Sequence, residues 1–239
     1  MTATRTRPDR ILDAAEAAFA ELGFAGTSLR HVVQAAGVNL ATVYYYFGSK
    51  EGLMEAVLKR RFGPLRAEHL EGLRAAEGVA RGRPLAIEKI LEIMLGPPLR
   101  LAIAAAEQRP AVARLLGRIV TEPNVHTQEF LRRQHAPIRT AFLDAMQRAL
   151  PQLPLPDLHW RMEFVWGALG FILCNPRRLE RETRGACNPV KADCVLAEMI
   201  AFFAPGFLAP AESHRPLACA RSRPLKQPKP KPPAASKPE

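Results

Sequence analysis

Three consecutive tyrosines, Tyr44, Tyr45 and Tyr46, are the only tyrosines among the 239 residues of the chain. They lie in the stretch GVNLATVYYYFGSKEGL, residues 37–53. Neighbouring side chains on a helix are about 100° apart, so three in a row cover roughly 200° of its circumference. They cannot all face one core, and at least one must point outward. We therefore interpret this short helix as an element that contacts a partner.

The three tyrosines belong to the second of two short helices, which are expected over residues 28–35 and 39–47. Thr27 is expected to cap the first and Asn39 the second, because their side-chain oxygens can accept backbone N–H groups. Gly37 lies in the turn between them and can adopt a positive φ. The pattern predicts a helix-turn-helix, whose second helix enters the major groove of DNA.

The positions of the residues along the second helix predict which of them face the core and which face outward. Val43 and Phe47 are four residues apart and are expected to face the core. The opposite face carries the candidate base-reading residues Leu40, Ala41, Tyr44 and Tyr45. Alanine and leucine suit a thymine methyl group, and tyrosine adds a hydroxyl group. Since this face has no Arg, Asn or Gln, readout is expected to depend on apolar contacts, water and DNA shape.

Other polar side chains lie at helix starts or edges, where phosphate contacts position a protein on DNA. These candidates are Thr27, Thr42, Tyr46 and Lys50. Arg30, near the start of the 28–35 helix, is expected to reach either a base or a phosphate. The sequence leaves Tyr46 open between packing in the core and contacting a phosphate.

The net charge of +11 favours a polyanionic partner, either nucleic acid or an anionic surface. Residues 214–239 contribute seven Lys or Arg against one Glu, so the body of the chain carries only a mild excess. The Pro- and Lys-rich tail, 209–239, cannot bury a core and is expected to be disordered. It either assists DNA binding by counterion release or is a solvated appendage.

Up to about residue 204 the sequence indicates helices, because Gly and Pro interrupt helical patterns and no β-branched run alternates with period two. The predicted fold class is therefore all-α. The expected domains are a helix-turn-helix DNA-binding domain over 1–52, a larger ligand-binding and dimerisation domain over 53–208, and the tail. Helices are expected from about Pro8 to Gly23, over 50–74, and then over 85–95, 97–108, 110–121, 124–150, 157–176 and 189–204, with a loop over 76–84 and a break at Pro97-Pro98.

The predicted 157–176 helix is apolar almost all round between Met162 and Leu173, with Glu163 as the lone charge. A helix of this kind must be covered on both sides. We infer that one side packs on its own core and the other, together with 189–204, on a second subunit, which predicts a homodimer. Candidate ligand-binding residues are Leu91, Met94, Phe130 and Phe164, which either line an apolar cavity or are plain core.

Catalytic and membrane functions find no support in the sequence. It contains no H-E-x-x-H or G-x-S-x-G motif and no glycine loop for phosphate, so we expect neither an enzyme nor a cofactor. The four cysteines have no zinc-ligand spacing and are expected to be reduced thiols, so no metal site is predicted. The N-terminus lacks the apolar segment of a signal peptide, and no apolar run reaches the ~18 residues of a membrane span. A cytoplasmic protein is expected.

Residues 10–55 contain the motifs A-x-x-A-F-x-E-x-G-F, G-T-S-L-R-x-V, A-G-V and T-V-Y-Y-Y-F-x-S-K-E-x-L. In these motifs the segment resembles the N-terminal domain of TetR-family transcriptional regulators. The resemblance implies an all-helical homodimer whose larger C-terminal domain binds a small molecule that releases the protein from a palindromic operator. It places the family's base-reading positions on Leu40, Ala41, Tyr44 and Tyr45, its phosphate-contacting positions on Thr27, Thr42, Tyr46 and Lys50, and a further contact on Arg30.

Residues 115–172 are similar to the effector domains of the fatty-acid-responsive, PsrA-like subgroup of this family. That similarity implies a fatty acid or an acyl-CoA as the effector. Two alternatives stay open. One is a DNA-binding regulator without a small-molecule sensor, controlled by a protein partner or by its abundance. The other is a helical enzyme or lipid carrier with an incidental basic N-terminal domain.

Overall fold

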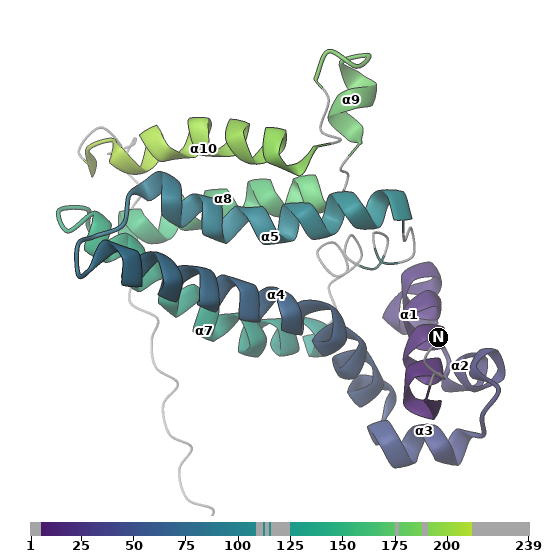
Figure 1. The fold of residues 1–239 in the computed structure, drawn as a ribbon. Helices are drawn as coiled ribbons and strands as arrows, with labels where there is room; N and C mark the ends of the chain where they lie inside the picture. Colours follow the sequence, from purple (N-terminus) through teal and green to yellow (C-terminus); the bar gives the residue numbers. More distant parts are fainter. Residues whose placement is uncertain are drawn as a thin grey trace, which may run out of the picture.

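The computed structural model describes residues 6–108, 112, 115, 125–174, 177–187 and 191–211. Within these ranges the secondary structure is helical and contains no strand, which confirms the predicted fold class. The helices are α1 (Arg7–Gly26), α2 (Leu29–Ala36), α3 (Leu40–Phe47), α4 (Lys50–Ala80), α5 (Ile87–Gln108), α7 (Val125–Ala149), α8 (Leu155–Cys174), α9 (Arg178–Glu182) and α10 (Ala192–Leu208). Figure 1 shows α1, α2 and α3 grouped at one end of the molecule and α5, α7, α8 and α10 forming a bundle at the other, with α4 leading from one group into the other.

The N-terminal group has its own hydrophobic cluster. Side chains from three helices meet in it, among them Phe19 of α1, Val32 of α2 and Val43 of α3, all fully buried. Leu53 and Leu58 of α4 belong to the same cluster. The first turns of α4 therefore pack with the DNA-binding group, past the expected boundary at residue 52.

The start of α2 differs from the prediction. Ser28, not Thr27, is the N-cap: its hydroxyl oxygen accepts the backbone N–H of His31 at 3.2 Å. Thr27 is buried instead, and its hydroxyl donates to the carbonyl of Gly23 at 2.7 Å. Gly23 itself has a φ of 72°, which interrupts α1 at the residue where the sequence predicted its end.

Helix α4 is longer than predicted. It continues through Ala80 and ends at Arg81, which has a left-handed φ of 49°. The prediction of a loop over 76–84 is wrong for its first half, because AAEGVA contains enough good helix formers to tolerate one glycine. Glu77 also forms an ion pair with Arg148 of α7, which fixes this last part of α4 to the bundle.

Helix α5 runs without interruption through Pro97 and Pro98, so the break predicted there is wrong. Proline normally breaks a helix because it leaves the carbonyl four residues earlier without a donor. For Pro98 that carbonyl belongs to Met94. The imidazole of His69 on α4 lies 3.0 Å from the Met94 oxygen through Nε2. A carbonyl can only accept, so Nε2 carries the proton and replaces the bond that Pro98 cannot make.

His69 is buried between helices and lies edge-on to the Phe142 ring of α7, with 5.5 Å between ring centroids. The larger hydrophobic cluster surrounds this contact and draws buried side chains from α4, α5, α7, α8 and α10. The end of α10 is fixed by a buried arginine of α8, since Arg161 donates to the carbonyls of Phe207 and Ala209 at 2.8 Å each.

The last helices follow the predicted pattern with shifted ends. Helix α8 begins at Leu155, two residues before the expected start, and α10 is displaced from 189–204 to Ala192–Leu208. The short helix α9 was not expected from the sequence, and it projects from the bundle in Figure 1. Most of the predicted 110–121 helix and nearly all of the tail, from residue 212 on, lie outside the described residues.

Candidate nucleic-acid interface

Local hydrogen bonds fix the helix that carries the tyrosines. Gly37 takes a left-handed φ of 62° in the turn before it. The Asn39 side-chain oxygen then accepts the backbone N–H of Thr42 at 2.8 Å and its hydroxyl at 2.7 Å. Gly48, with a φ of 72°, ends the helix. The cap predicted at Asn39 is therefore confirmed, and α3 starts and stops at defined residues.

The three tyrosines all face solvent. Exposure is 51% for Tyr44, 83% for Tyr45 and 44% for Tyr46, while Val43 beside them is fully buried. The outward orientation predicted for Tyr44 and Tyr45 is confirmed, and for Tyr46 the alternative of core packing is excluded. The Tyr45 and Tyr46 rings meet edge to face at 5.0 Å between centroids. Figure 1 places α3 at the end of the molecule away from the bundle, so nothing else in the described chain covers this surface.

The remaining candidates for DNA contact differ in what their side chains can do. Ala41 and Arg30 are exposed, and Leu40 is half-buried. Thr42 is half-buried and its hydroxyl is engaged with Asn39. Since Thr27 is 1% exposed, its hydroxyl does not face a partner in this conformation. Their roles in DNA contact stay predictions.

Lys50 lies at the start of α4, beside α1. Its Nζ is 4.5 Å from the centroid of the Phe24 ring and donates to the carbonyl of Ala25 at 3.4 Å. Both contacts are weak enough for the ammonium group to turn toward a phosphate. A cation held at this edge of the unit suits the predicted positioning role.

Replacing this cation tests that role. Lys50→Gln is expected to weaken binding to all DNA sequences alike and to lower the slope of log affinity against log salt by about one, because one phosphate contact is lost. Fluorescence anisotropy with a specific and an unrelated duplex, at several salt concentrations, measures both effects. An effect confined to the specific duplex would contradict a phosphate contact.

Glu16 of α1 forms ion pairs with Arg60 and Arg61 of α4, a cluster that we call the carboxylate clamp. This attachment of α1 to α4 was not predicted from the sequence. Glu16 is 6% exposed, and both of its oxygens accept from Arg61, at 2.5 and 2.6 Å. Arg60 donates to Glu16 at 3.0 Å and to Asp13 at 2.9 Å. Burial by itself raises the pKa of Glu16, but the two guanidinium groups outweigh it and hold the pKa below its ordinary value. The available signal was a carboxylate in the middle of the apolar run AAEAAFA.

The candidate ligand residues do not share one site. Leu91 and Met94 are fully buried in the core of the bundle. Phe164 is 59% exposed, so neither of the two alternatives for it, lining an internal cavity or packing in the core, agrees with the structure: its face of α8 points out of the bundle. The side chain of Phe130 lies outside the described residues.

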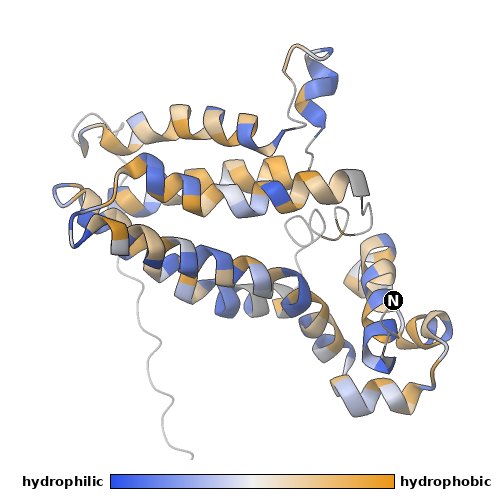
Figure 2. Cartoon of the chain, viewed as in Figure 1, coloured by the Kyte–Doolittle hydropathy of each residue, from blue (hydrophilic) through white to orange (hydrophobic). Residues whose placement is uncertain are grey.

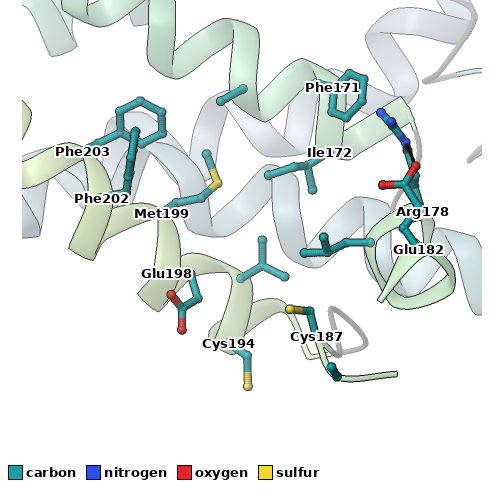
Figure 3. Close-up of a pocket in the computed structure, with 14 residues that line it drawn as sticks. Phe171, Ile172, Arg178, Glu182, Cys187, Cys194, Glu198, Met199, Phe202 and Phe203 are labelled. Atoms are coloured by element: carbon teal, nitrogen blue, oxygen red, sulfur yellow. Dashed lines mark hydrogen bonds and ion pairs between the residues drawn. The ribbon is translucent and has the colours of Figure 1, made fainter. Parts of the chain in front are cut away.

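Two hollows in the described surface lie elsewhere. The larger has a volume of about 830 Å³, is open to the surface, and lies between α8, α9 and α10. Figure 3 shows Phe171, Ile172, Met199, Phe202 and Phe203 around it, with Arg178 and Glu182 of α9 at one side. The smaller, of about 360 Å³, lies between α7 and α8. Leu91, Met94 and Phe164 line neither of them.

Other kinds of site find no support in the described part of the chain. It holds no group of three His, Cys, Asp or Glu side chains arranged to bind a metal ion. Cys187 and Cys194 are free thiols there, and Cys219 lies outside it. None of the described helices is long and apolar enough to cross a membrane.

Comparison with known protein families matches both parts of the chain. Residues 11–57 match the model described as "Bacterial regulatory proteins, tetR family", and residues 92–206 match "Tetracyclin repressor-like, C-terminal domain". Together these matches cover about two thirds of the chain.

Two curated relatives carry similar segments. The transcriptional regulator RutR of Escherichia coli is 34% identical over 112 residues, which are 41% of this chain and 52% of RutR. The regulator BetI of Burkholderia thailandensis is 33% identical over 81 residues, 34% of this chain and 42% of BetI. The chain thus spans at most about half the length of these relatives. Both are named helix-turn-helix-type transcriptional regulators.

Two solved structures share the fold. The fatty acid degradation regulator FadR from Bacillus halodurans superposes with a TM-score of 0.62 at 15% identity, over 86% of this chain and 98% of FadR. The hemolysin II transcriptional regulator HlyIIR superposes with a TM-score of 0.50 at 19% identity, over 82% of this chain and 95% of HlyIIR. At these identities the likeness concerns the arrangement of helices alone.

Proposed function

Since the chain belongs to the TetR family of bacterial transcriptional regulators, we propose that it is a homodimeric repressor that leaves a palindromic operator when it binds a small, apolar or acyl-type effector. Its family and its relatives are transcriptional regulators, so it is a DNA-binding regulator and not an enzyme. The observation that carries the proposal is α3, which exposes Tyr44, Tyr45 and Ala41 at one end of a chain with a net charge of +11. The protein acts in the cytoplasm, where the DNA is.

On DNA, α3 enters the major groove and the exposed tyrosines meet base edges. Thr42, Tyr46, Lys50 and Arg30 lie around this helix, at positions suited to phosphate contacts. We also propose a phosphate contact at Thr27, because it lies just before the start of α2, where a backbone N–H can approach a phosphate.

The dimer forms through α8 and α10. These helices leave large apolar side chains in water: exposure is 65% for Trp160, 59% for Phe164, 53% for Phe171 and 77% for Phe202. Figure 2 shows α10 hydrophobic along most of its length, in contrast to α4. Contiguous apolar surface of this kind marks an interaction site. One face of α8 already packs on the core of its own chain. A second copy of the chain, placing the same helices against this surface, covers the other face.

A charge placed on this face tests the dimer. Phe202→Asp is expected to raise the dimer dissociation constant at least about thirtyfold, because removing a central aromatic anchor costs about 2 kcal/mol or more. Sedimentation velocity across a dilution series measures it. Val79→Asp is the matched control: Val79 is 81% exposed on α4, a helix that packs mainly against α1, α5 and α7, and its variant should stay dimeric. Equal dissociation constants for the two variants would place the interface elsewhere.

Helix α4 connects the effector domain to the DNA-binding group. Its first turns pack with α1, α2 and α3, and its middle contributes His69 to the core of the bundle. Half-sites for such dimers lie about 34–36 Å apart, or a multiple of it, so a small tilt of α4 spoils the fit of both copies. The fold shared with the fatty acid degradation regulator FadR supports an acyl-type effector.

The experiment is an anisotropy titration of a labelled duplex from the region upstream of the protein's own gene. A DNA-binding regulator should lose affinity by roughly 10³–10⁵ between about 50 and 200 mM salt if it makes six to ten phosphate contacts. A fatty acid or an acyl-CoA should then release the bound duplex. No binding at low salt would contradict the proposal.

One observation favours a second candidate, a regulator without a small-molecule sensor. Leu91 and Met94 are fully buried, and the two hollows described above are open to the surface rather than enclosed. In that case DNA binding would show the same salt dependence, and no acyl compound would release the duplex. The release step therefore separates the two candidates.

A further inference from the structure

The smaller hollow, between α7 and α8, combines an apolar floor with a cationic rim. Its floor is formed by Leu143 of α7 and by Met162 and Trp166 of α8. Its rim carries Arg132 and Arg139 of α7 and His159 of α8, and no carboxylate is among the described residues that line it. A volume of about 360 Å³ falls in the range of small-molecule sites, about 300–1,000 Å³.

The two arginines of the rim differ in how strongly they are already paired with carboxylates. Arg132 forms two hydrogen bonds with Glu129 at 2.8 Å. Arg139 has only a loose ion pair, in which its Nη2 lies 4.0 Å from Glu163 and both side chains are more than half exposed. Burial, and then the positive charge of Arg139, lower the pKa of the neighbouring His135. Of the two arginines at the mouth of the groove, Arg139 is therefore the one whose guanidinium is more available to an anion above the apolar floor.

We propose that this groove, which we call the α7–α8 groove, binds the anionic head of an amphipathic effector. The carboxylate or phosphate lies between Arg139 and His159, and the adjoining apolar segment lies on Trp166 and Met162. The inference rests on the proposed function, in which the effector is of acyl type, and it adds the residues that recognise the charged end. Arg139 is the main contact because its guanidinium can turn from Glu163 to a better placed oxyanion.

The same groove is connected to the DNA-binding end through one helix. Arg133, next to Arg132, forms an ion pair with Glu55 of α4 at 3.1 Å, and Arg66 of α4 donates to Gln134 at 3.5 Å. Glu129 lies between the two arginines, 2.8 Å from Arg132 and 4.0 Å from Arg133. Arg132 also lines the groove, so the anion held by Arg139 attracts Arg132 as well and frees Glu129 to compete with Glu55 for Arg133. Effector binding thereby loosens α7 from the first turns of α4.

Trp166 provides a direct readout of the groove, and Trp160 is the only other tryptophan in the chain. The experiment uses a full-length Trp160→Phe protein and follows Trp166 fluorescence on addition of dodecanoate, dodecanoyl-coenzyme A, dodecanol or inorganic phosphate. Saturable quenching is expected with one or both acyl anions. Binding of dodecanoate alone identifies a carboxylate site, and preference for the coenzyme A ester identifies a phosphate site.

Three variants in the Trp160→Phe background test the assignment. Arg139→Gln should weaken binding of the acyl anion about tenfold, which corresponds to about 1.4 kcal/mol, and should leave dodecanol binding unchanged. Glu163→Gln should strengthen anion binding two- to threefold, roughly as expected from removing a weakly competing surface carboxylate. Arg178→Gln on α9, which removes an arginine paired with Glu182 away from the groove, should bind like the parent.

Either equal affinities of Arg139→Gln and the parent, or no saturable quenching of the parent by any acyl anion, overturns the site. DNA binding is measured without effector on the same proteins and on the wild type. Loss of the groove signal with intact DNA binding rejects this inference alone, whereas absence of DNA binding in the wild type rejects the proposed function. The two failures are thus distinguishable.

Discussion

Lowering the pH from 7 to 4 is expected to reduce the free energy of unfolding by roughly 3 kcal/mol through His69 alone. Burial lowers the pKa of this imidazole from 6.5 to about 4, against the opposing effect of its hydrogen bond to the Met94 carbonyl. The unfolded chain takes up this proton near pH 6.5 and the folded protein only near pH 4. The loss therefore develops as the pH falls between these values, and His69 has no such effect above them.

Urea unfolding at several pH values between 7 and 4, for the wild type and His69→Leu, measures this contribution. The variant should lose the part of the pH dependence that His69 causes. His135, whose pKa burial also lowers, is present in both proteins and cancels in the comparison. Parallel stability curves for the two proteins would contradict a neutral, buried His69.

The role of His69 beneath Pro98 has a separate test at pH 7. His69→Leu leaves the Met94 carbonyl buried without a donor, which costs about 1–3 kcal/mol. Pro98→Ala restores a backbone N–H to that carbonyl. His69→Leu should therefore cost at least about 1 kcal/mol less in a Pro98→Ala background. The second ring nitrogen, Nδ1, is buried without a partner in the described chain, but its removal is common to both backgrounds. If His69→Leu costs the same in the wild-type and the Pro98→Ala backgrounds, the His69 side chain does not replace the backbone donor that Pro98 lacks.

Removing the carboxylate clamp should have an effect of similar size. Glu16→Ala is expected to lower the free energy of unfolding by about 3 kcal/mol, because it leaves two guanidinium groups without their counter-charge in a partly buried site. The Arg60 and Arg61 side chains are only 24% and 19% exposed. Urea unfolding followed by circular dichroism measures the change. Glu92→Ala, which breaks an exposed ion pair with Lys89, is the control and should change stability little.

The stabilising contribution of the carboxylate clamp also depends on pH, but through a charged group, whereas that of His69 depends on a neutral one. The pKa of Glu16 is lower in the folded protein than its ordinary value of 4.5. Its stabilising contribution is therefore complete above about pH 4.5 and is lost as the pH falls through the lower, folded pKa. Glu16→Ala should be less sensitive than the wild type to pH below about 4.5. A variant with unchanged stability and unchanged acid sensitivity would show that the clamp contributes nothing.

Features that depend on nearby residues could be predicted from the sequence. The cap at Asn39, the left-handed turn at Gly37 and the outward face of α3 all follow from atoms within three or four positions along the chain. The choice between Thr27 and Ser28 as the cap of α2 could not be made in the same way. Both are good caps, and the choice depends on the burial of Thr27 against Gly23.

Features that depend on distant partners could not be predicted. Pro97-Pro98 reads locally as a break, and the group that prevents it, His69, lies on a different helix. Glu16 reads as a surface charge on α1, but its partners, Arg60 and Arg61, lie more than forty residues away. Phe164 was a reasonable cavity residue by composition, and only the packing of α8 places it outside.

The most direct test of the central claim, that α3 reads DNA, is an anisotropy titration of the upstream duplex with wild type, Tyr44→Ala, Tyr45→Ala and the double variant. Each tyrosine should contribute about 5- to 150-fold to specific affinity, since one base contact is worth about 1–3 kcal/mol. Affinity for an unrelated duplex should change little, because the phosphate contacts remain. Circular dichroism should show that the variants stay folded. If the double variant binds the upstream duplex as tightly as the wild type, α3 is not the reading helix.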